Sequence, residues 1–338
     1  MQRMSVWEEI KKSKGKKFLF FVEKSPEEIN YGKYERMRME IWQDPNDHLS
    51  CPRNMAAENY FNDGSSLFIG IYTEDEKGII RRDENHFIGF SYGYVGVIDK
   101  NTAYQKVSNL NFYSQYAAVR KDYRSFNLGV MLKKFQKKIV QDVFNINTIT
   151  CTFDPLTGVN AYRNIHKLGM EVIQYKESFY KGFSGTLNRK DIPSDRFYVL
   201  WKLKEEDKKM DYDLDLILSG ENLVVSSNLK KVKGKNTRLD MEVSHEVNLN
   251  ILKQFKEYLL VEVPYDFYRM IQETDVPDEK TRRIPLDWRM RTRKAFKNLF
   301  KAGYKVEDFR CKSMNQRFRN FYVLRKKKSG SKHGTELS

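Results

Sequence analysis

Cysteine is scarce in this chain, and long apolar runs are missing. Cys51, Cys151 and Cys311 are the only cysteines among 338 residues, and they lie far apart without the paired spacing of a metal site. An odd number of dispersed cysteines excludes a disulfide-rich class and is typical of a reducing compartment. The apolar stretch ending at Val22 is too short for a signal peptide or a membrane span, and no later run approaches about 18 apolar residues. These absences predict a cytoplasmic protein without a metal or a membrane partner.

Positive charge is concentrated near the end of the chain. The net charge is +16, but residues 280–338 alone hold 19 lysines and arginines against 4 acidic residues. Four basic residues recur every four positions on one expected helix and form a basic stripe: Arg289, Arg293, Lys297 and Lys301. Such a stripe is usually a solvated helix face. With the nearby aromatics Phe318, Phe321 and Tyr322, it leaves nucleic acid open as a partner, although no nucleic-acid motif favours one.

Length and patterning indicate two folded parts. A chain of 338 residues with 40% hydrophobic residues can bury two cores. Residues 1–203 alternate strand and helix patterns and predict the larger domain. Residues 204–250 predict a linker and hairpin, residues 251–325 a smaller αβ region, and residues 326–338 a disordered basic tail.

Local patterns place the individual elements. Strands are expected at 18–23, 66–73, 86–98, 111–119, 148–153, 197–203, 258–263 and 321–324. Helices are expected from the Ser25 to Glu28 capping box to about residue 42, and at 128–143, 154–168 and 285–302. Residues 43–63, rich in proline, asparagine and aspartate, form a candidate wall of a substrate pocket.

One strand-to-helix joint, Asp122-Tyr-Arg-Ser-Phe-Asn-Leu-Gly129, is unusual. A helix N-terminus exposes about four amides without intrahelical partners and carries partial positive charge, so it favours an anion. Asn127 tolerates a left-handed conformation, Gly129 permits close approach, and Arg124 offers a fork matched to phosphate oxygens. The joint is therefore either a pyrophosphate loop or an ordinary strand-to-helix connection.

The motifs around this joint resemble the GNAT superfamily of N-acetyltransferases. Arg124-Ser-Phe-Asn-Leu-Gly129 is similar to the [RQ]-x-x-G-x-[GA] loop of that superfamily, and Lys167-Leu-Gly-Met170 is similar to the end of its second motif. Three further stretches resemble a narrower group of predicted acetyltransferases with a C-terminal extension: Thr152-Phe-Asp-Pro-Leu156, Val159-Asn-Ala161 and Pro193-Ser-Asp-Arg-Phe197. The resemblance spans roughly residues 18–203. It implies an α+β fold with a mixed, mostly antiparallel sheet flanked by helices, followed by a smaller αβ region.

The resemblance also implies a donor, a mechanism and a set of site residues. Acetyl-CoA would be the acyl donor, and a small-molecule or peptide amine would attack the thioester directly, without a metal. The pyrophosphate would bind the loop, at Arg124, Ser125, Phe126, Asn127, Leu128 and Gly129. The pantetheine arm would contact the main chain of Ala117, Ala118 and Val119, and the side chain of Asn160. A strand amide near Val119 would stabilise the oxyanion.

Three positions depart from the superfamily pattern: Asn127 stands where the first glycine of the loop usually is, and two others remove the usual acid and base. Ile165 stands where many members place a tyrosine acid, and Gln115 stands where many place a glutamate base. Asp154, between a strand and a proline, is the candidate base, acting through a water, with an ordinary turn residue as the alternative. Further candidates, each with a structural alternative, are Tyr162, Tyr180, His166 and the pair Asp195 and Arg196.

The sequence thus predicts an N-acyltransferase that moves an acetyl or related group from acyl-CoA to an amine. Two alternatives stay open. One is an aminoacyl-transfer relative in which the second region is half of a doubled acyltransferase fold. The other is a non-enzymatic CoA-sensing or nucleic-acid-binding protein with a decayed site, which the missing acid and base favour and the intact loop disfavours.

Overall fold

The computed structural model describes residues 6–23, 31–43, 66–103, 105–180, 185, 187–205, 211–314 and 316–327. The chain forms two compact units that are interleaved in sequence. Unit 1 comprises residues 1–152, 183–187 and 199–206, and unit 2 comprises residues 153–182, 188–198 and 207–338. The main division lies between Thr152 and Phe153, upstream of the boundary predicted after residue 203.

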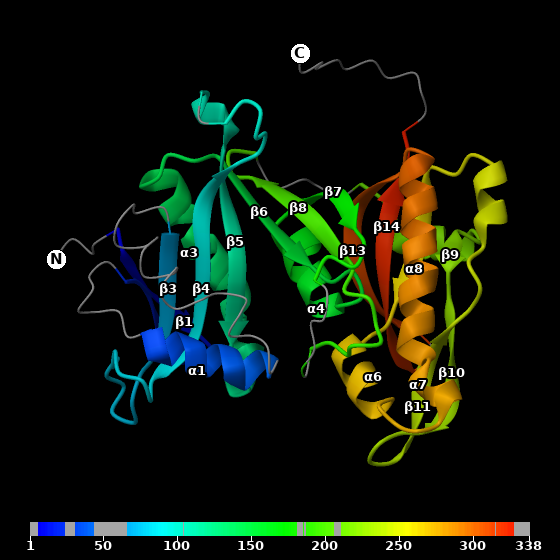
Figure 1. Cartoon of the computed structure of the whole chain (residues 1–338), viewed down its shortest axis with the longest axis horizontal. Coiled ribbons are helices and arrows are strands. Elements are labelled where there is room, and N and C mark those ends of the chain that lie inside the picture. Colours follow the sequence, from blue (N-terminus) through cyan, green and yellow to red (C-terminus); the bar gives the residue numbers. More distant parts are fainter. Residues whose placement is uncertain are drawn as a thin grey trace. The chain divides into compact units, whose positions relative to one another are not determined.

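An eight-stranded sheet has the strand order β1-β2-β3-β4-β5-β6-β8-β7 (Figure 1). Its strands are β1 (Glu8–Ser13), β2 (Lys16–Val22), β3 (Ser66–Thr73), β4 (Phe87–Val97), β5 (Leu110–Val119), β6 (Thr148–Phe153), β7 (Glu171–Lys176) and β8 (Arg196–Lys202). Strands β1 to β5 pair antiparallel with their sequence neighbours, and β5 pairs parallel with β6. The predicted α+β fold with a mixed, mostly antiparallel sheet is confirmed.

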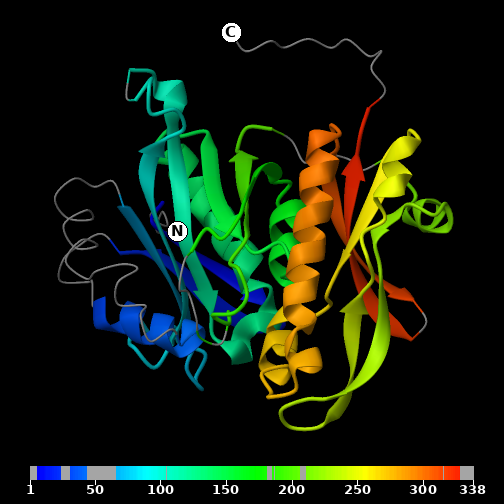
Figure 2. The same cartoon turned by 45° about the vertical axis from the view of Figure 1, so that its right-hand side comes forward.

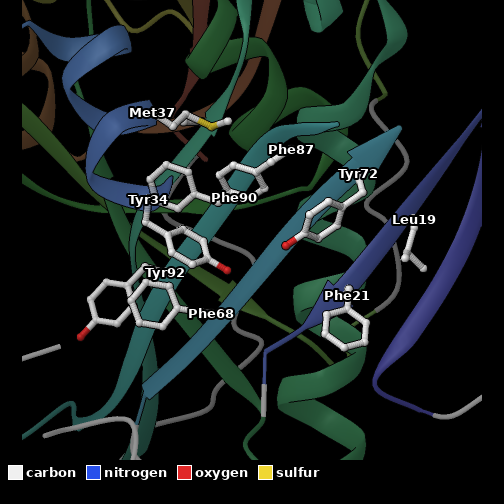
Figure 3. Close-up of a cluster of buried hydrophobic side chains, with 10 residues drawn as sticks. Leu19, Phe21, Tyr34, Met37, Phe68, Tyr72, Phe87, Phe90 and Tyr92 are labelled. Carbon is white, nitrogen blue, oxygen red and sulfur yellow. The ribbon is translucent and has the colours of Figure 1, made fainter. Parts of the chain in front are cut away.

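Two helices of unit 1, α1 (Tyr31–Trp42) and α3 (Leu128–Asp142), cover opposite faces of its sheet. Because successive side chains of a strand alternate between the two faces of a sheet, β2 contributes side chains to the packing against both helices. Phe21 lies in the buried cluster that includes Tyr34 and Met37 of α1 (Figure 3). Phe20 points the other way, and its ring centre is 6.0 Å from that of Phe135 on α3. Burial of both faces explains the continuous apolar run in β2.

Unit 2 contains a four-stranded sheet of order β13-β14-β12-β9 and a two-stranded ribbon, β10-β11. The strands are β9 (Leu223–Val225), β10 (Ser227–Lys233), β11 (Arg238–Ser244), β12 (Tyr258–Val263), β13 (Lys305–Met314) and β14 (Arg317–Arg325). The helices are α4 (Gly158–Ala161), the π-helical turn η4 (Tyr162–Lys167), α5 (Leu214–Ser219), α6 (Phe267–Glu273), α7 (Glu279–Arg282) and α8 (Ile284–Lys301). Figure 2 shows α8 lying along this sheet, which buries its apolar residues, among them Trp288, Phe296 and Leu299.

One strand order occurs twice in the chain. Strand β6 is followed by α4, η4, β7 and β8, and β8 lies between β6 and β7. Strand β12 is followed by α6, α7, α8, β13 and β14, and β14 lies between β12 and β13. Each of the two opening strands also has a parallel partner, β5 for β6 and β9 for β12. The connection from β5 to β6 is helix α3, whereas the ribbon β10-β11 and the short helix η5 (Leu249–Lys253) connect β9 to β12.

Several predicted features lie outside the described residues: the Ser25 to Glu28 capping box, most of the 43–63 segment, and the tail beyond residue 327. Within the described part of the chain, no helix is long and apolar enough to cross a membrane.

Candidate functional site

Strand β5 contains a bulge and ends without a partner on one side. The register between β4 and β5 shifts between Tyr92 and Gly93, which makes Gln115 an extra residue in β5. The parallel ladder from β5 to β6 stops at the pairing of Tyr113 with Thr150. In the described chain, the segment of β5 beyond the bulge therefore has a ladder to β4 alone.

The main chain of Ala117 and Val119 faces the open side of β5. The Arg120 amide donates to the Ile88 carbonyl on the β4 side at 2.9 Å. Main-chain groups alternate between the two edges of an antiparallel strand, so those of Ala117 and Val119 point away from β4. The Val119 carbonyl accepts a hydrogen bond from Arg124 Nε at 3.2 Å. The Ala117 main chain and the Val119 amide thus lie at an open sheet edge.

The turn after β5 has the left-handed residue that the sequence predicts. A short 3₁₀ helix, η3 (Lys121–Phe126), ends at Asn127, whose φ of 59° and ψ of 22° are left-handed, and α3 starts at Leu128. The amides of Val130 and Met131 donate to the Asn127 carbonyl. The amides at the start of α3, those of Leu128 and Gly129, have no carbonyl acceptor within the helix. The predicted conformation of Asn127 is confirmed.

Exposed and cationic side chains surround the turn. Arg124, Ser125 and Asn127 are exposed, whereas Leu128 is buried and anchors the helix start. The bond from Arg124 Nε to Val119 occupies one guanidinium nitrogen and leaves two terminal nitrogens for another acceptor.

The β1-β2 turn lies beside this loop. Ser13 Oγ donates to the Phe126 carbonyl at 2.9 Å, and the ring centre of Phe126 is 5.3 Å from that of Phe18. The ammonium groups of Lys14 and Lys16 lie 5.8 and 5.9 Å from the Phe126 ring. The left-handed turn, the open helix start and these cations together favour an anion in unit 1.

The candidate base, Asp154, is part of a buried ion pair in unit 2. Its Oδ1 accepts a hydrogen bond from Arg289 Nη1 at 2.8 Å, and its Oδ2 accepts one from Arg289 Nη2. The exposed fractions are 6% for Asp154 and 0% for Arg289. Burial alone would lower the pKa of Arg289, but the charge and hydrogen bonds of Asp154 outweigh it, and the net pKa lies above its usual value.

This geometry argues against the base role of Asp154. Both oxygens of Asp154 accept guanidinium hydrogen bonds, so the lone pairs that a base would use are already engaged. Asp154 Oδ1 also accepts from the Leu156 amide at 2.8 Å, as an aspartate does in an ordinary turn. The ion-pair partner, Arg289, was expected on a solvent-facing stripe, so sequence periodicity alone could not reveal the pair.

Asn160, the candidate pantetheine contact, lies in unit 2 and is engaged there. Its Oδ1 accepts from Arg163 Nη2 at 2.8 Å, and its Nδ2 donates to Thr157 Oγ1 at 3.1 Å and to the Tyr268 hydroxyl at 3.5 Å. Its contact with a cofactor stays a prediction.

The basic stripe on α8 is largely neutralised by carboxylates of unit 2. Besides the Arg289 pair, Arg293 makes a bidentate pair with Asp195, at 2.8 and 2.6 Å. Lys297 Nζ lies 2.5 Å from Glu177 Oε1. Two of the three nearby aromatics, Phe321 and Tyr322, are buried. The stripe is therefore not a free cationic surface.

The remaining candidates in unit 2 have distinct surroundings. Asp195 pairs with Arg293 rather than with Arg196, and Arg196 lies 4.9 Å from the Tyr180 ring centre. Burial by itself would raise the pKa of Asp195, but the Arg293 hydrogen bond and nearby cations bring it below its usual value. Asp195 is therefore a structural ion-pair member.

His166 is oriented by a buried carboxylate. Its Nδ1 lies 2.9 Å from Oδ1 of Asp308, a fully buried residue that also accepts from the Tyr212 hydroxyl at 2.5 Å. Burial, followed by the Asp308 hydrogen bond and charge, raises the pKa of Tyr212. His166 lies in the π-helical turn η4, and β13 has a bulge next to Asp308. Both irregularities are frequent at functional sites. Asp308 is far from His166 in sequence, so no local motif indicated this pair.

No family model and no curated protein matches this sequence. Among solved structures, an acetyltransferase of the GNAT family from Desulfovibrio desulfuricans is 11% identical, with a TM-score of 0.39, over 55% of this chain and 99% of its own. The ribosomal-protein-S5-alanine acetyltransferase of Vibrio fischeri is 10% identical, with a TM-score of 0.39, over 56% of this chain and 96% of its own. The NatC complex bound to Gag peptide and CoA has 13% identity and a TM-score of 0.36, over 54% of this chain and 98% of the matched chain. Nearly half of this chain lies outside each of these three matches.

Proposed function

We propose that unit 1 binds an acyl-CoA and that the protein transfers its acyl group to an amine. One observation carries the proposal: the open edge of β5 at Ala117 and Val119 leads directly into the left-handed turn and the free amides that begin α3. A CoA thioester has the complementary chemistry, because its pyrophosphate suits the helix start and its amide-bearing pantetheine arm can pair with a sheet edge.

The donor contacts follow from the positions of these groups. The amides of Leu128 and Gly129 and the terminal nitrogens of Arg124 bind the pyrophosphate, with Ser125, Phe126 and Asn127 shaping the loop. The main chain of Ala117 to Val119 holds the pantetheine arm. The amide of Val119 then donates to the thioester oxygen as it gains negative charge during attack.

The chemistry is direct transfer in a ternary complex. The lone pair of a neutral amine attacks the thioester carbon, a carbon–nitrogen bond forms, and the carbon–sulfur bond breaks. The surplus proton on the nitrogen passes through solvent to the departing thiolate, which gives an amide and the CoA thiol. A thiolate has a reference pKa near 8.5, so it leaves without a strong acid, although Ile165 stands where a tyrosine acid is common. An alkylammonium acceptor must first lose a proton, because only the neutral amine has a lone pair for the attack.

The two alternatives differ in what the second half of the chain should provide. The repeated strand order supports a partly doubled fold. However, the second copy connects β9 to β12 through the β10-β11 ribbon and η5 rather than through a long helix, so it offers no counterpart of the α3 start. We therefore propose one donor site. A CoA sensor with a decayed site would bind the thioester but release no thiol in the presence of amines.

The test combines calorimetry and thiol release. Acetyl-CoA should bind the purified chain, and Gly129→Val should weaken binding more than tenfold, about 1.4 kcal/mol, because a branched side chain would meet the phosphates. Gly96→Val is the matched control, since a Cβ at Gly96 in β4 would meet no atom within 4 Å. Equal affinity in the wild type and Gly129→Val would refute the donor site. Binding without thiol release across a panel of amines would favour the sensor.

A further inference from the structure

The ribbon β10-β11 carries five exposed cations that lack carboxylate partners. Lys230, Lys231, Lys233, Lys235 and Arg238 are all exposed, and in the described part of the chain none lies within 4.0 Å of a carboxylate oxygen. This differs from α8 and β14, where Arg293, Lys297 and Arg319 have carboxylate partners. The ribbon thus displays a group of cations without carboxylate partners, whereas Arg289, Arg293 and Lys297 of the stripe are paired.

The acidic groups around the ribbon only partly offset this charge. Asp240 is the cross-strand neighbour of Lys231, and Asp278 at the start of α7 interacts with the charge of Lys230. Glu273 lies at the hairpin turn, where its Oε1 accepts from Asn236 Nδ2 at 3.3 Å. Strand β10 carries three lysines and no acidic residue, whereas β11 carries Arg238 against Asp240 and Glu242, so the excess of positive charge lies on β10 and at the hairpin turn.

An exposed aromatic pair lies beside the ribbon. The rings of Tyr265 and Phe318 stack at 5.6 Å with an interplanar angle of 21°, and their exposed fractions are 50% and 54%. Two contacts join this pair to the ribbon. The Tyr265 amide donates to Glu242 of β11 at 2.8 Å, and Arg317, which precedes Phe318, donates from Nη2 to the Ser227 carbonyl of β10 at 3.0 Å. The cross-strand partner of Glu242 is Leu229, which is 46% exposed.

We propose that this ribbon and the Tyr265 and Phe318 pair form a binding surface for single-stranded nucleic acid. A row of cations follows a phosphate backbone, and an exposed ring face offers a base a stacking partner. Both elements belong to unit 2 and neither is used by the donor loop. The surface therefore provides a binding activity beyond acyl transfer.

The aromatic pair favours a single strand over two other polyanions. In a duplex the bases already stack on each other and present only their edges, so the exposed rings would gain no partner. An acidic peptide would satisfy the lysines but has no planar bases to cover Tyr265 and Phe318. A single strand uses both features.

The experiment measures fluorescence anisotropy of a labelled oligouridine with the full-length protein. Single-strand binding should weaken linearly on a log-log scale as salt rises from about 50 to 200 mM, with a slope near −0.7 for each neutralised phosphate. The triple variant Lys230→Gln, Lys233→Gln, Lys235→Gln should reduce the slope by about 2. The matched control, Lys294→Gln, Lys297→Gln, Lys301→Gln on α8, changes the net charge equally and should leave the slope unchanged. Phe318→Ala should weaken binding by about tenfold, because one base loses its stacking partner.

Four results would overturn the proposal. They are no binding of oligouridine at about 50 mM salt, equal losses in the ribbon and control variants, tighter binding of a duplex of equal length, or equal binding of polyglutamate. Wild-type urea unfolding midpoints in the ribbon variants would show that unit 2 remains folded. Because this control does not use acetyl-CoA, failure of the proposal is distinguishable from failure of the donor site.

Discussion

Arg289 on α8 holds both carboxylate oxygens of Asp154, although 135 positions separate the two residues in the chain. The pair is buried, so its charges compensate each other in a region that excludes water. It fixes the segment that follows β6 to the longest helix of unit 2. Asp154 therefore has a structural role as the ion-pair partner of Arg289, and a role in proton transfer would disrupt this pair.

Asp154→Asn should destabilise the protein rather than slow the chemistry. The substitution leaves the buried Arg289 cation without its counter-ion, which typically costs 3 to 5 kcal/mol, roughly. Urea unfolding measures the loss, and turnover per folded molecule should stay close to wild type. Asp191→Asn, in a more exposed pair with Arg189, is the control and should cost less than about 1 kcal/mol. A stable Asp154→Asn protein with strongly reduced turnover would restore Asp154 as the base.

The double replacement Asp154→Leu, Arg289→Met tests whether removing both charges of the pair together restores stability. Replacing both charges by apolar side chains of similar size removes the desolvation cost of both ions, so stability should recover to near wild type. Urea unfolding of the double variant against each single variant gives the coupling energy. Additive losses would mean that the two side chains do not act as a pair.

Asn127 should be replaceable by glycine but not by valine. Its φ of 59° is free for glycine and costs a branched residue roughly 1 to 2 kcal/mol. Asn127→Gly should therefore keep acetyl-CoA affinity within about threefold, whereas Asn127→Val should lower it more than tenfold, about 1.4 kcal/mol. Calorimetry measures both variants. Equal affinities would show that the conformation of this turn does not matter for the donor.

His166→Gln should lower the free energy of unfolding by about 1 to 3 kcal/mol, because the buried Asp308 carboxylate loses its imidazole partner. Urea unfolding measures the loss. The control is His86→Gln, which should cost less, since His86 forms an exposed pair with Asp83 at 2.7 Å. Equal losses in the two glutamine variants would mean that burial of Asp308 adds nothing to the pair.

Glu242 should make unit 2 less stable as the pH rises from about 4.5 to above 7. Burial, with a smaller contribution from Glu262, raises its pKa to about 7, although the Tyr265 amide and the cations Arg317 and Arg319 favour ionisation. The folded state thus binds this proton more tightly than the unfolded state. The resulting stability is fully present below about pH 4.5 and is lost as pH rises through about 7.

Glu242→Gln should remove this dependence. The variant should match the wild type in urea unfolding at pH 8 or exceed its free energy of unfolding by about 1 to 3 kcal/mol, and it should lose that advantage at pH 5. The opposite pH trend would mean that Glu242 is ionised in the folded protein throughout this range.

Elements with strong local signals could be predicted from the sequence. Strands β3, β6 and β12 coincide with their predicted ranges, because each is a short apolar run between polar turns. Gly169 is left-handed, with a φ of 64°, and directly follows residue 168, where the sequence predicts the end of a helix. The turn at Asn127 was also predictable, since the conformational preference of asparagine is local.

The missed features depend on contacts between distant parts of the chain. Strands β1, β7 and β13 are rich in charged residues, and half-buried and exposed positions are mixed along them. Their hydrophobicity pattern therefore does not distinguish them from loops. The pairs of Arg289 with Asp154 and of His166 with Asp308 join segments more than 130 residues apart. Charge spacing on α8 predicted a cationic face because the sequence does not show which carboxylates oppose it.

The interleaving of the two units affects how a shortened chain would behave. Unit 1 includes residues 199–206, and β8 is the strand that borders β6 on the side away from β5. A ribosome delivers residues in order, so β6 emerges well before its neighbour and stays an open sheet edge while the intervening segment is made. Open edges invite pairing with other molecules. A fragment truncated after residue 152 should therefore self-associate, and expression trials of unit 1 need a chain that extends through residue 206.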